Sequence, residues 1–470
     1  MVWKYRKMLK SVVLFACVLW TVSCHNHAMS QPPMGWEQLP EILGRIEAPV
    51  FPNREFDITD FGADGDGRTK CTEAFEKAVG ACHLAGGGRV VVPEGVFLTG
   101  PIHLRSNVCL HVSKGATILF SDRFEDYLPP VLIRWEGREC YNLSPLIYAN
   151  GCRNIAVTGK GTLDGQGEKW WSWRRGPGEP YRKSNEQNAQ WAQENVPVEK
   201  RVQGKKDFHW CPTFISPVKC QNVLIEGLTI IDGPFWNVHP LYCENVTVRN
   251  LIIKNHGPNG DGCNPDSCRD VLIEDCYFDT GDDCIAIKSG RNTDGRRVNI
   301  PSENIVVRRC EMKDGHGGVV MGSEMSGGVR NVFVEDCTMD SPNLDRALRI
   351  KTNSVRGGFV ENVYMRNVSI GQVGDAVLRI NFYYGEKDTG QFPPRVRNIN
   401  MENVTSKKST YGLRIQAYER APATDIRIEN CSFQNVAKPN VLEGVEDVRF
   451  NNVRINEELF NKTINPGSKG

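Results

Sequence analysis

Short runs of alternating apolar and polar residues recur along the chain, and each run is headed by an asparagine or an aspartate. From residue 222 onward, neighbouring heads are separated by 23 residues at the shortest (Asn222 to Asn245) and by 36 at the longest (Asn362 to Asn398). One such unit cannot bury its own apolar side, so successive units must stack as the coils of a solenoid. The pattern predicts an all-β protein, a parallel β-helix whose coils are headed by Asn154, Asn222, Asn245, Asp270, Asn304, Asn331, Asn362, Asn398 and Asp425.

Asparagine suits the head position because it tolerates left-handed backbone angles and bonds its own main chain. Leucine-rich repeats are the alternative repeat fold. They would need leucines at fixed positions and a regular unit length, and the sequence shows neither.

The first coil of a β-helix exposes strand edges and core, so it must be covered. The stretch from Thr69 to Leu84 has the spacing of an amphipathic helix, and we expect it to be this N-terminal cap. Its apolar face consists of Ala74, Phe75, Ala78, Val79 and Cys82. The sequence divides into a signal segment at 1–24, a linker at 25–48, the β-helix domain at 49–460 and a tail at 461–470.

Residues 164–211 interrupt the repeat with a long polar insertion that is rich in tryptophan. A connection of this length is expected to fold over one face of the solenoid. Its aromatic side chains either stack on sugar rings or only fasten the insertion to the body. They are Trp170, Trp171, Trp173, Trp191 and Trp210.

The chain begins with basic residues followed by an apolar stretch from Ser11 to Val22, which is typical of a secretory signal and too short to span a bilayer. The stretch ends in Thr21-Val22-Ser23-Cys24, which resembles a bacterial lipoprotein signal. We therefore expect export to the bacterial cell envelope, periplasm or outer membrane, with a lipid on Cys24. Ordinary cleavage and release is the alternative.

The 17 cysteines are many for an exported chain, where disulfides are permitted. Cys276, Cys310, Cys337 and Cys431 share one position of the repeat, which favours a column of reduced thiols in the core. Cys263 and Cys268 are close enough in sequence to pair. The net charge of +1 gives no global field for nucleic acid or an anionic membrane, so an acidic substrate must be bound by a local cluster.

Equal spacing brings candidate catalytic residues together. Asp282 and His316 each lie 12 residues after the heads of their coils, Asp270 and Asn304. Equal offsets place them on neighbouring strands, about 4.8 Å apart along the stack. Asp261 precedes Asp282 by 21 residues, close to one coil, and should lie on its other side.

Two cations join this face. Because alternate strand residues point to opposite sides, Arg349 and Lys351 should project outward together while Ile350 packs inward. Asp282 and Asp283 can serve one site only if Gly281 lets the chain turn or bulge.

Paired carboxylates are the groups that glycoside hydrolysis needs: one protonated acid and one ionised carboxylate. Crowding raises one carboxyl pKa so that this group stays protonated. The two cations suit a substrate that is itself a carboxylate, such as a uronic acid, and His316 can bond the acid and tune its pKa.

These clusters resemble the signature set of glycoside hydrolase family 28, the polygalacturonases and their relatives. The family pattern is Asn-Thr-Asp, Gly-Asp-Asp, Gly-His-Gly and Arg-Ile-Lys in that order. The chain has Asn259-Gly260-Asp261, Gly281-Asp282-Asp283, Gly315-His316-Gly317 and Arg349-Ile350-Lys351, with Gly260 in place of the threonine. The resemblance covers roughly residues 55 to 455.

The resemblance implies a right-handed β-helix and hydrolysis with inversion, without metal or cofactor. It implies that Asp282 is the general acid and that Asp261 and Asp283 activate water. It further implies that His316 supports the acid, and that Arg349 and Lys351 hold a galacturonate carboxylate.

Four residues near these motifs are further candidates. Lys288 and Arg291 either add positive charge to the cleft or are solvated surface cations. His239, one coil earlier, either touches the sugar or is a packed turn histidine. Asp266 lies 16 residues before Asp282, out of register, and is expected to be structural or to line a subsite.

The expected function is hydrolysis of α-linked galacturonic acid in pectin by a monomer. Exo action is favoured because the 164–211 insertion can wall off one end of the cleft, and because the segment from Asp282 to Asn292 is similar to the exo-acting bacterial branch. A rhamnogalacturonan hydrolase is the alternative within the family. A β-helix pectate lyase would need a calcium-binding carboxylate cluster and leaves the Gly-His-Gly and Arg-Ile-Lys clusters without a role. A catalytically silent glycan-binding β-helix is the third class.

Overall fold

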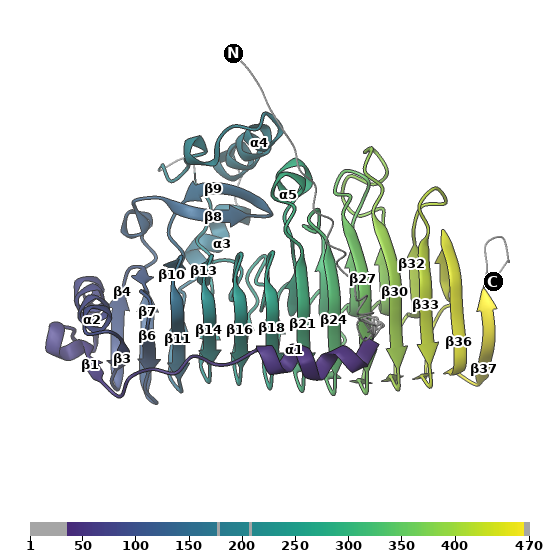
Figure 1. The fold of residues 1–470 in the computed structure, drawn as a ribbon, viewed down its shortest axis with the longest axis horizontal. Coiled ribbons are helices and arrows are strands. Elements are labelled where there is room, and N and C mark those ends of the chain that lie inside the picture. The colour runs from purple at the N-terminus through teal and green to yellow at the C-terminus, as the bar shows by residue number, and fades with distance from the viewer. Residues whose placement is uncertain (1–34, 176–178, 206–208, 465–470) are drawn as a thin grey trace, which may run out of the picture.

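The computed structural model describes residues 35–175, 179–205 and 209–464. It shows the right-handed parallel β-helix that the repeat pattern and the family resemblance predict, drawn with its long axis horizontal in Figure 1. The proposed signal segment, including Cys24, and residues 25–34 lie outside the described residues. None of the helices in the described ranges is long and apolar enough to cross a lipid bilayer.

Three ladders of parallel strands form the faces of the solenoid. The first ladder, in pairing order, is β1 (Glu55–Asp57), β3 (Gly88–Val92), β6 (Val108–Val112), β11 (Arg153–Gly159), β14 (Gln221–Glu226), β16 (Glu244–Arg249), β18 (Arg269–Glu274), β21 (Ser302–Arg308), β24 (Val329–Glu335), β27 (Phe359–Arg366), β30 (Arg395–Glu402), β33 (Ala423–Glu429) and β36 (Val445–Ile455).

The second ladder runs beside the first and meets it in β36. It contains β2 (Asp66–Lys70), β4 (Gly95–Thr99), β7 (Ala116–Phe120), β12 (Thr162–Asp164), β15 (Thr229–Ile231), β17 (Ile252–Asn255), β19 (Tyr277–Thr280), β22 (Glu311–Met312), β25 (Thr338–Met339), β28 (Ser369–Ile370), β31 (Thr405–Ser406) and β34 (Ser432–Phe433). The antiparallel strand β37 (Glu458–Ile464) closes the C-terminal edge against β36, so residues 461–464 belong to the fold rather than to the predicted tail.

The third ladder carries the candidate site. It contains β5 (Ile102–His103), β10 (Ile147–Asn150) and β13 (Ile215–Val218), followed by β20 (Ile285–Ile287), β23 (Val319–Gly322), β26 (Arg346–Lys351), β29 (Ala376–Asn381), β32 (Tyr411–Gln416) and β35 (Val441–Glu443). Single bridges through Val238 and Cys263 connect β13 to β20. The face is therefore continuous from the N-terminal coils to the catalytic motifs.

The predicted heads of the coils all have left-handed backbone angles, with φ between 53° and 59°. Their side chains also bond one another along the solenoid. Asn245 donates its amide to Asn222 at 2.8 Å, and Asn331 donates to Asn304 at 3.0 Å. Each amide can donate to one neighbour and accept from the other, so the ladder fixes the register of successive coils.

Apolar side chains fill the inside of the solenoid. Cys276, Cys310, Cys337 and Cys431 are buried there, as the repeat position predicts. Cys263 and Cys268 are free thiols, so they do not form the disulfide that their spacing would allow.

Helix α2 (Thr72–Leu84) packs on β1 and β3 at the N-terminal end and buries the five predicted apolar residues, which confirms the cap. The short helix α1 (Leu39–Arg45) and the turn η1 (Gly35–Gln38) correct the linker prediction. Leu39 and Ile42 pack on Leu272, Val306 and Phe333 of the first ladder, and Figure 1 shows α1 lying along the outside of the coils. Sequence reasoning missed this because two short apolar contacts carry no periodic signal.

The insertion forms helices α3 (Glu168–Arg175) and α4 (Glu179–Gln193) and the turn η4 (Val198–Lys200). With the hairpin β8 (Val131–Trp135) and β9 (Arg138–Asn142) and the helix α5 (Asn292–Val298), it stands on one side of the solenoid (Figure 1). Two short turns, η2 (Ile58–Phe61) and η3 (Phe124–Tyr127), complete the described elements. Trp170 and Trp210 are buried, so they fasten the insertion rather than present an open stacking surface.

Candidate active site

Three successive coils bring the predicted acids and the histidine to the third ladder, and the next coil adds Arg349 and Lys351. The His316 backbone N–H donates to the Asp282 carbonyl at 3.1 Å, so these residues are level on neighbouring coils, as their equal offsets predict. On the other side, the Gly262 N–H donates to the Asp283 carbonyl at 3.0 Å, which places Asp261 level with Asp283.

Glycines allow this close packing. A Cβ on Gly281 would lie 2.8 Å from the backbone of His256, and one on Gly260 would lie 2.6 Å from the Asn255 carbonyl oxygen. Position 281 therefore requires glycine because the neighbouring turn approaches closely, and not because its backbone adopts a left-handed φ angle. Gly260, which departs from the family motif, meets the same requirement.

Asp283 lies buried at the bottom of the site. Its side chain is 0% exposed, and it accepts a hydrogen bond from Lys351 Nζ at 2.6 Å and one from Arg349 Nη1 at 3.3 Å. Asp282, its neighbour in sequence, faces the cavity instead. The chain bends between β19 and β20, so Asp282 lines the cavity while Asp283, the next residue, lies beneath it.

Asp282 and His316 form a pair at the surface of the cavity, with Nδ1 and Oδ1 3.0 Å apart. Burial alone would raise the Asp282 pKa, but the hydrogen bond and charge of His316 hold it well below its usual range. The same hydrogen bond raises the pKa of His316. These opposite shifts favour an ion pair in which the proton lies on His316, beside the Asp282 carboxylate that faces the cavity.

Asp261 is buried beside a cation. Lys288 Nζ lies 3.5 Å from Asp261 Oδ2 and 3.2 Å from Glu324 Oε2. Burial raises the pKa of Asp261 to about 7, against the opposing charge of Lys288 and with added repulsion from Asp282 and Asp283. Asp261 Oδ1 has no hydrogen-bond partner among the described residues.

This distribution suits acid–base hydrolysis. A general base works best with a pKa near the working pH, and Asp261 meets that condition. Above that pKa Asp261 is an ionised base, and the raised pKa of His316 favours a proton held beside Asp282. The orphan oxygen of Asp261 is where a water molecule would be bound.

A cavity of about 530 Å³ contains these groups. Its described lining includes the predicted residues Asp261, Asp282, His316, Lys288, Arg291, Arg349 and Lys351, together with Glu136, Trp236, Ser323, Glu324, Arg356, Tyr384 and Glu386, which sequence reasoning missed. A larger hollow of about 1240 Å³ lies at the C-terminal end, between residues 434 and 464, and contains none of the predicted acids.

One side of the cavity is bridged by ion pairs. Arg291 bonds Glu136 at the tip of the β8–β9 hairpin at 3.2 Å and Glu386, in the loop after β29, at 3.4 Å. Arg356 bonds the same Glu386 at 2.9 Å. We call Glu136, Arg291, Glu386 and Arg356 the bridging cluster.

The insertion supports the bridging cluster through contacts with the hairpin and with α5. Tyr181 of α4 donates its hydroxyl to Glu136 at 2.9 Å, and Arg201 bonds Asp294 of α5 at 2.9 Å. Among the described residues, none between 164 and 211 lines the cavity. The prediction that the insertion is itself the wall is therefore wrong, because the hairpin lies between it and the cleft.

His239 does not reach the cavity, which corrects the prediction that it touches the sugar. The histidine is 1% exposed, packs edge-on against Trp236 and lies 3.5 Å from Asp266. Asp266 in turn bonds the fully buried Arg134 of β8 at 2.7 Å, which makes it structural, as its spacing indicated. These contacts fasten the hairpin to the coil below the site.

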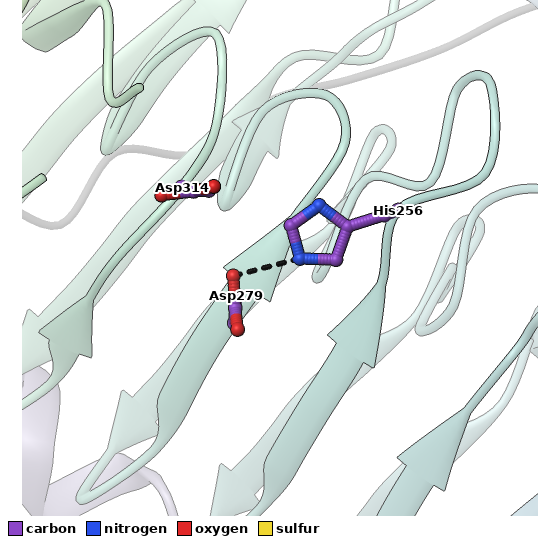
Figure 2. A group of neighbouring side chains, drawn as sticks. All are labelled: His256, Asp279 and Asp314. Atoms are coloured by element: carbon purple, nitrogen blue, oxygen red, sulfur yellow. Dashed lines mark hydrogen bonds and ion pairs between the residues drawn. The ribbon is translucent and has the colours of Figure 1, made fainter. Parts of the chain in front are cut away.

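A second group of polar residues lies close to the catalytic turns. His256 Nε2 and Asp279 Oδ1 are 2.8 Å apart, and Asp314 is near both (Figure 2). Their ligand atoms lie within 4.8 Å of one another, a spacing that a metal ion could occupy. Asp314 is bonded by Ser341 and Asn343 of the next coil, and the three residues are not part of the cavity lining.

The fold and the clustered carboxylates define an enzyme that hydrolyses O-glycosidic bonds. The family model "Glycosyl hydrolases family 28" matches residues 82–395. The chain therefore belongs to glycoside hydrolase family 28.

Curated relatives agree with this family. A protein named "Probable polygalacturonase" from Vitis vinifera is 31% identical over 395 residues, covering 81% of this chain and 74% of its own length. The "Exo-poly-alpha-D-galacturonosidase" of Dickeya chrysanthemi is 27% identical over 432 residues, covering 84% and 70%.

A solved structure agrees as well. The crystal structure of a hyperthermoactive exopolygalacturonase from Thermotoga maritima superposes with a TM-score of 0.88 at 43% identity. It covers 92% of this chain and 99% of the other.

Proposed function

We propose that the protein hydrolyses α-linked galacturonic acid in pectin with inversion, removing residues from a chain end. The observation that carries this proposal is the position of Asp261 and Asp282 in one cavity with Lys288, Arg349 and Lys351. Acids provide the chemistry, and cations provide donors for a substrate carboxylate. The exo-acting relatives from Dickeya chrysanthemi and Thermotoga maritima support the choice of polymer and of chain-end action.

The bridging cluster supports chain-end action. It links the hairpin tip to the loop after β29, and so obstructs one end of the cleft with ionic contacts. A polymer could not pass through such an end. An endo-acting enzyme needs a groove open at both ends.

The direct test is digestion of polygalacturonate and of rhamnogalacturonan with product sizing over time. We expect single galacturonate residues from the first time point on polygalacturonate. Cleavage of rhamnogalacturonan but not of polygalacturonate would assign the enzyme to the rhamnogalacturonan hydrolases of the family. An early ladder of oligomers would show endo action. An unsaturated product absorbing in the ultraviolet would indicate a lyase.

Removing the bridging cluster should change the product pattern. In Glu136→Ala/Glu386→Ala, Arg291 loses both carboxylate partners that hold the hairpin tip and the loop together. We expect oligomers of two or more residues to appear early, because the polymer can extend past the opened end. The same time course on Glu457→Ala/Glu458→Ala, at the distant C-terminal edge, should match the unmodified enzyme; unchanged single-residue release by the first variant would contradict the role of the cluster.

We further propose that the protein is a monomer that is exported and held at the bacterial cell envelope by a lipid on Cys24. The support is the basic, apolar and Ser-Cys order of residues 1–24. Fractionation of cells grown with labelled palmitate should give a labelled, membrane-bound protein and an unlabelled Cys24→Ser variant. A labelled variant, or an unlabelled original, would refute the anchor.

A further inference from the structure

Glu324 is a buried acid that the acid–base scheme does not use. It follows β23, its side chain is 10% exposed, and Oε2 lies 3.2 Å from Lys288 Nζ. The Ser289 N–H donates to the Glu324 carbonyl at 2.6 Å, so the backbone holds Glu324 on the coil beside Lys288. A buried carboxylate is costly unless it is paired, which makes this contact a built feature rather than a solvated one.

Lys288 is shared between two carboxylates. Its ammonium is 3% exposed and lies 4.3 Å over the Trp236 ring, with Glu324 at 3.2 Å and Asp261 at the longer distance of 3.5 Å. A charge-assisted N–H···O contact free of competition closes to about 2.8 Å. The longer distance to Asp261 therefore shows that Glu324 takes the stronger contact.

This sharing matters because Asp261 must remain a base. A lysine bound to Asp261 alone would stabilise its ionised form and weaken its attraction for a proton. It would also compete with a water molecule for the carboxylate. Asp261 Oδ2 already accepts from Asn264 at 2.7 Å, which leaves the unpartnered Oδ1 for water.

We propose that Glu324 is a positioning residue that draws the Lys288 ammonium away from Asp261 and so keeps Asp261 a competent base for water activation. The proposal rests on the proposed hydrolysis and deepens it. Glu324 acts through Lys288 and does not touch the reacting atoms. Lys288 is therefore shared between Glu324, the positioning residue, and Asp261, the proposed base.

The test compares pH profiles of kcat/KM on polygalacturonate for two variants with opposite expected shifts. In Glu324→Gln, Lys288 turns to Asp261, so the acid limb should move to lower pH by about one pH unit, with a lower kcat. In Lys288→Met, Asp261 loses its cation, so the acid limb should move to higher pH. A merely structural role would lower activity or stability while the limb stays in place.

Two further variants complete the design. Glu324→Asp keeps the charge with a shorter reach and should restore part of the unmodified profile. Glu324→Gln/Lys288→Met should place the limb where Lys288→Met alone places it, because Glu324 acts through Lys288; a clear difference between these two variants would contradict the proposal even where Glu324→Gln fails to fold. An acid limb that stays fixed in Glu324→Gln, or moves to higher pH, would overturn the inference. An unmodified enzyme without activity on polygalacturonate would instead overturn the proposed function.

Discussion

The Asp282→Asn variant is expected to lose about three orders of magnitude in kcat, while its affinity for oligogalacturonate stays within a few fold. General acid catalysis contributes 10²- to 10⁴-fold, and an amide has no proton of suitable acidity for the leaving oxygen. Asparagine has the shape of aspartate and still bonds His316, which lies 3.0 Å away, so the cavity should keep its form. Turnover and equilibrium binding, measured on the same sample, give the two quantities.

A substrate with an acidic leaving group sharpens this test. An aryl galacturonide needs little protonation of its leaving oxygen, so Asp282→Asn should hydrolyse it with a much smaller loss. Asp279→Asn is the matched control, because Asp279 lies three residues earlier on β19 and bonds His256 outside the cavity (Figure 2). Undiminished hydrolysis of polygalacturonate by Asp282→Asn, or an equal loss in Asp279→Asn, would contradict the acid assignment.

Repetition explains why the fold and much of the site were readable from sequence. The offset of 12 residues from a coil head placed Asp282 beside His316 because Asn304 donates its amide to Asp270 at 2.8 Å, which holds the two coils in register. Strand alternation placed Arg349 and Lys351 on one side in the same way. Local pattern and long-range contact coincide in a solenoid, since each coil touches only its neighbours.

The residues that sequence reasoning missed lie outside the repeated strands, where spacing along the sequence does not predict contact. Glu136 belongs to a hairpin tip more than one hundred residues before Arg291, and no spacing rule connects them. Glu386 lies in the loop between β29 and β30, outside the repeated strands. Glu324 could have been predicted from the sequence, because it is an acid on the coil after Lys288. The strand register shifts by one residue at this point, so the spacing of the two residues does not match that of the neighbouring strands. His239 was misplaced because burial beside Trp236 depends on the hairpin above it.

The Lys351→Met variant is expected to lower the free energy of unfolding by about 3 kcal/mol, because it leaves a buried charge without its nearest partner. Asp283 is 0% exposed, and Lys351 Nζ is its closest cation at 2.6 Å, whereas Arg349 remains at 3.3 Å. We also expect kcat/KM to fall by about 100-fold, since a substrate carboxylate loses a buried donor. Urea unfolding and initial rates measure the two effects, and Lys160→Met, at an exposed turn, is the matched control.

A second change separates stability from function. In Asp283→Asn/Lys351→Met the buried charge is gone, and neutral replacement of a buried pair is often close to neutral in stability. The double variant should therefore recover most of the lost unfolding free energy. It should remain inactive, because the family resemblance implies that Asp283 activates water together with Asp261. An unfolding midpoint unchanged in Lys351→Met would show that Arg349 alone compensates Asp283, and recovered hydrolysis in the double variant would remove Asp283 from the reaction.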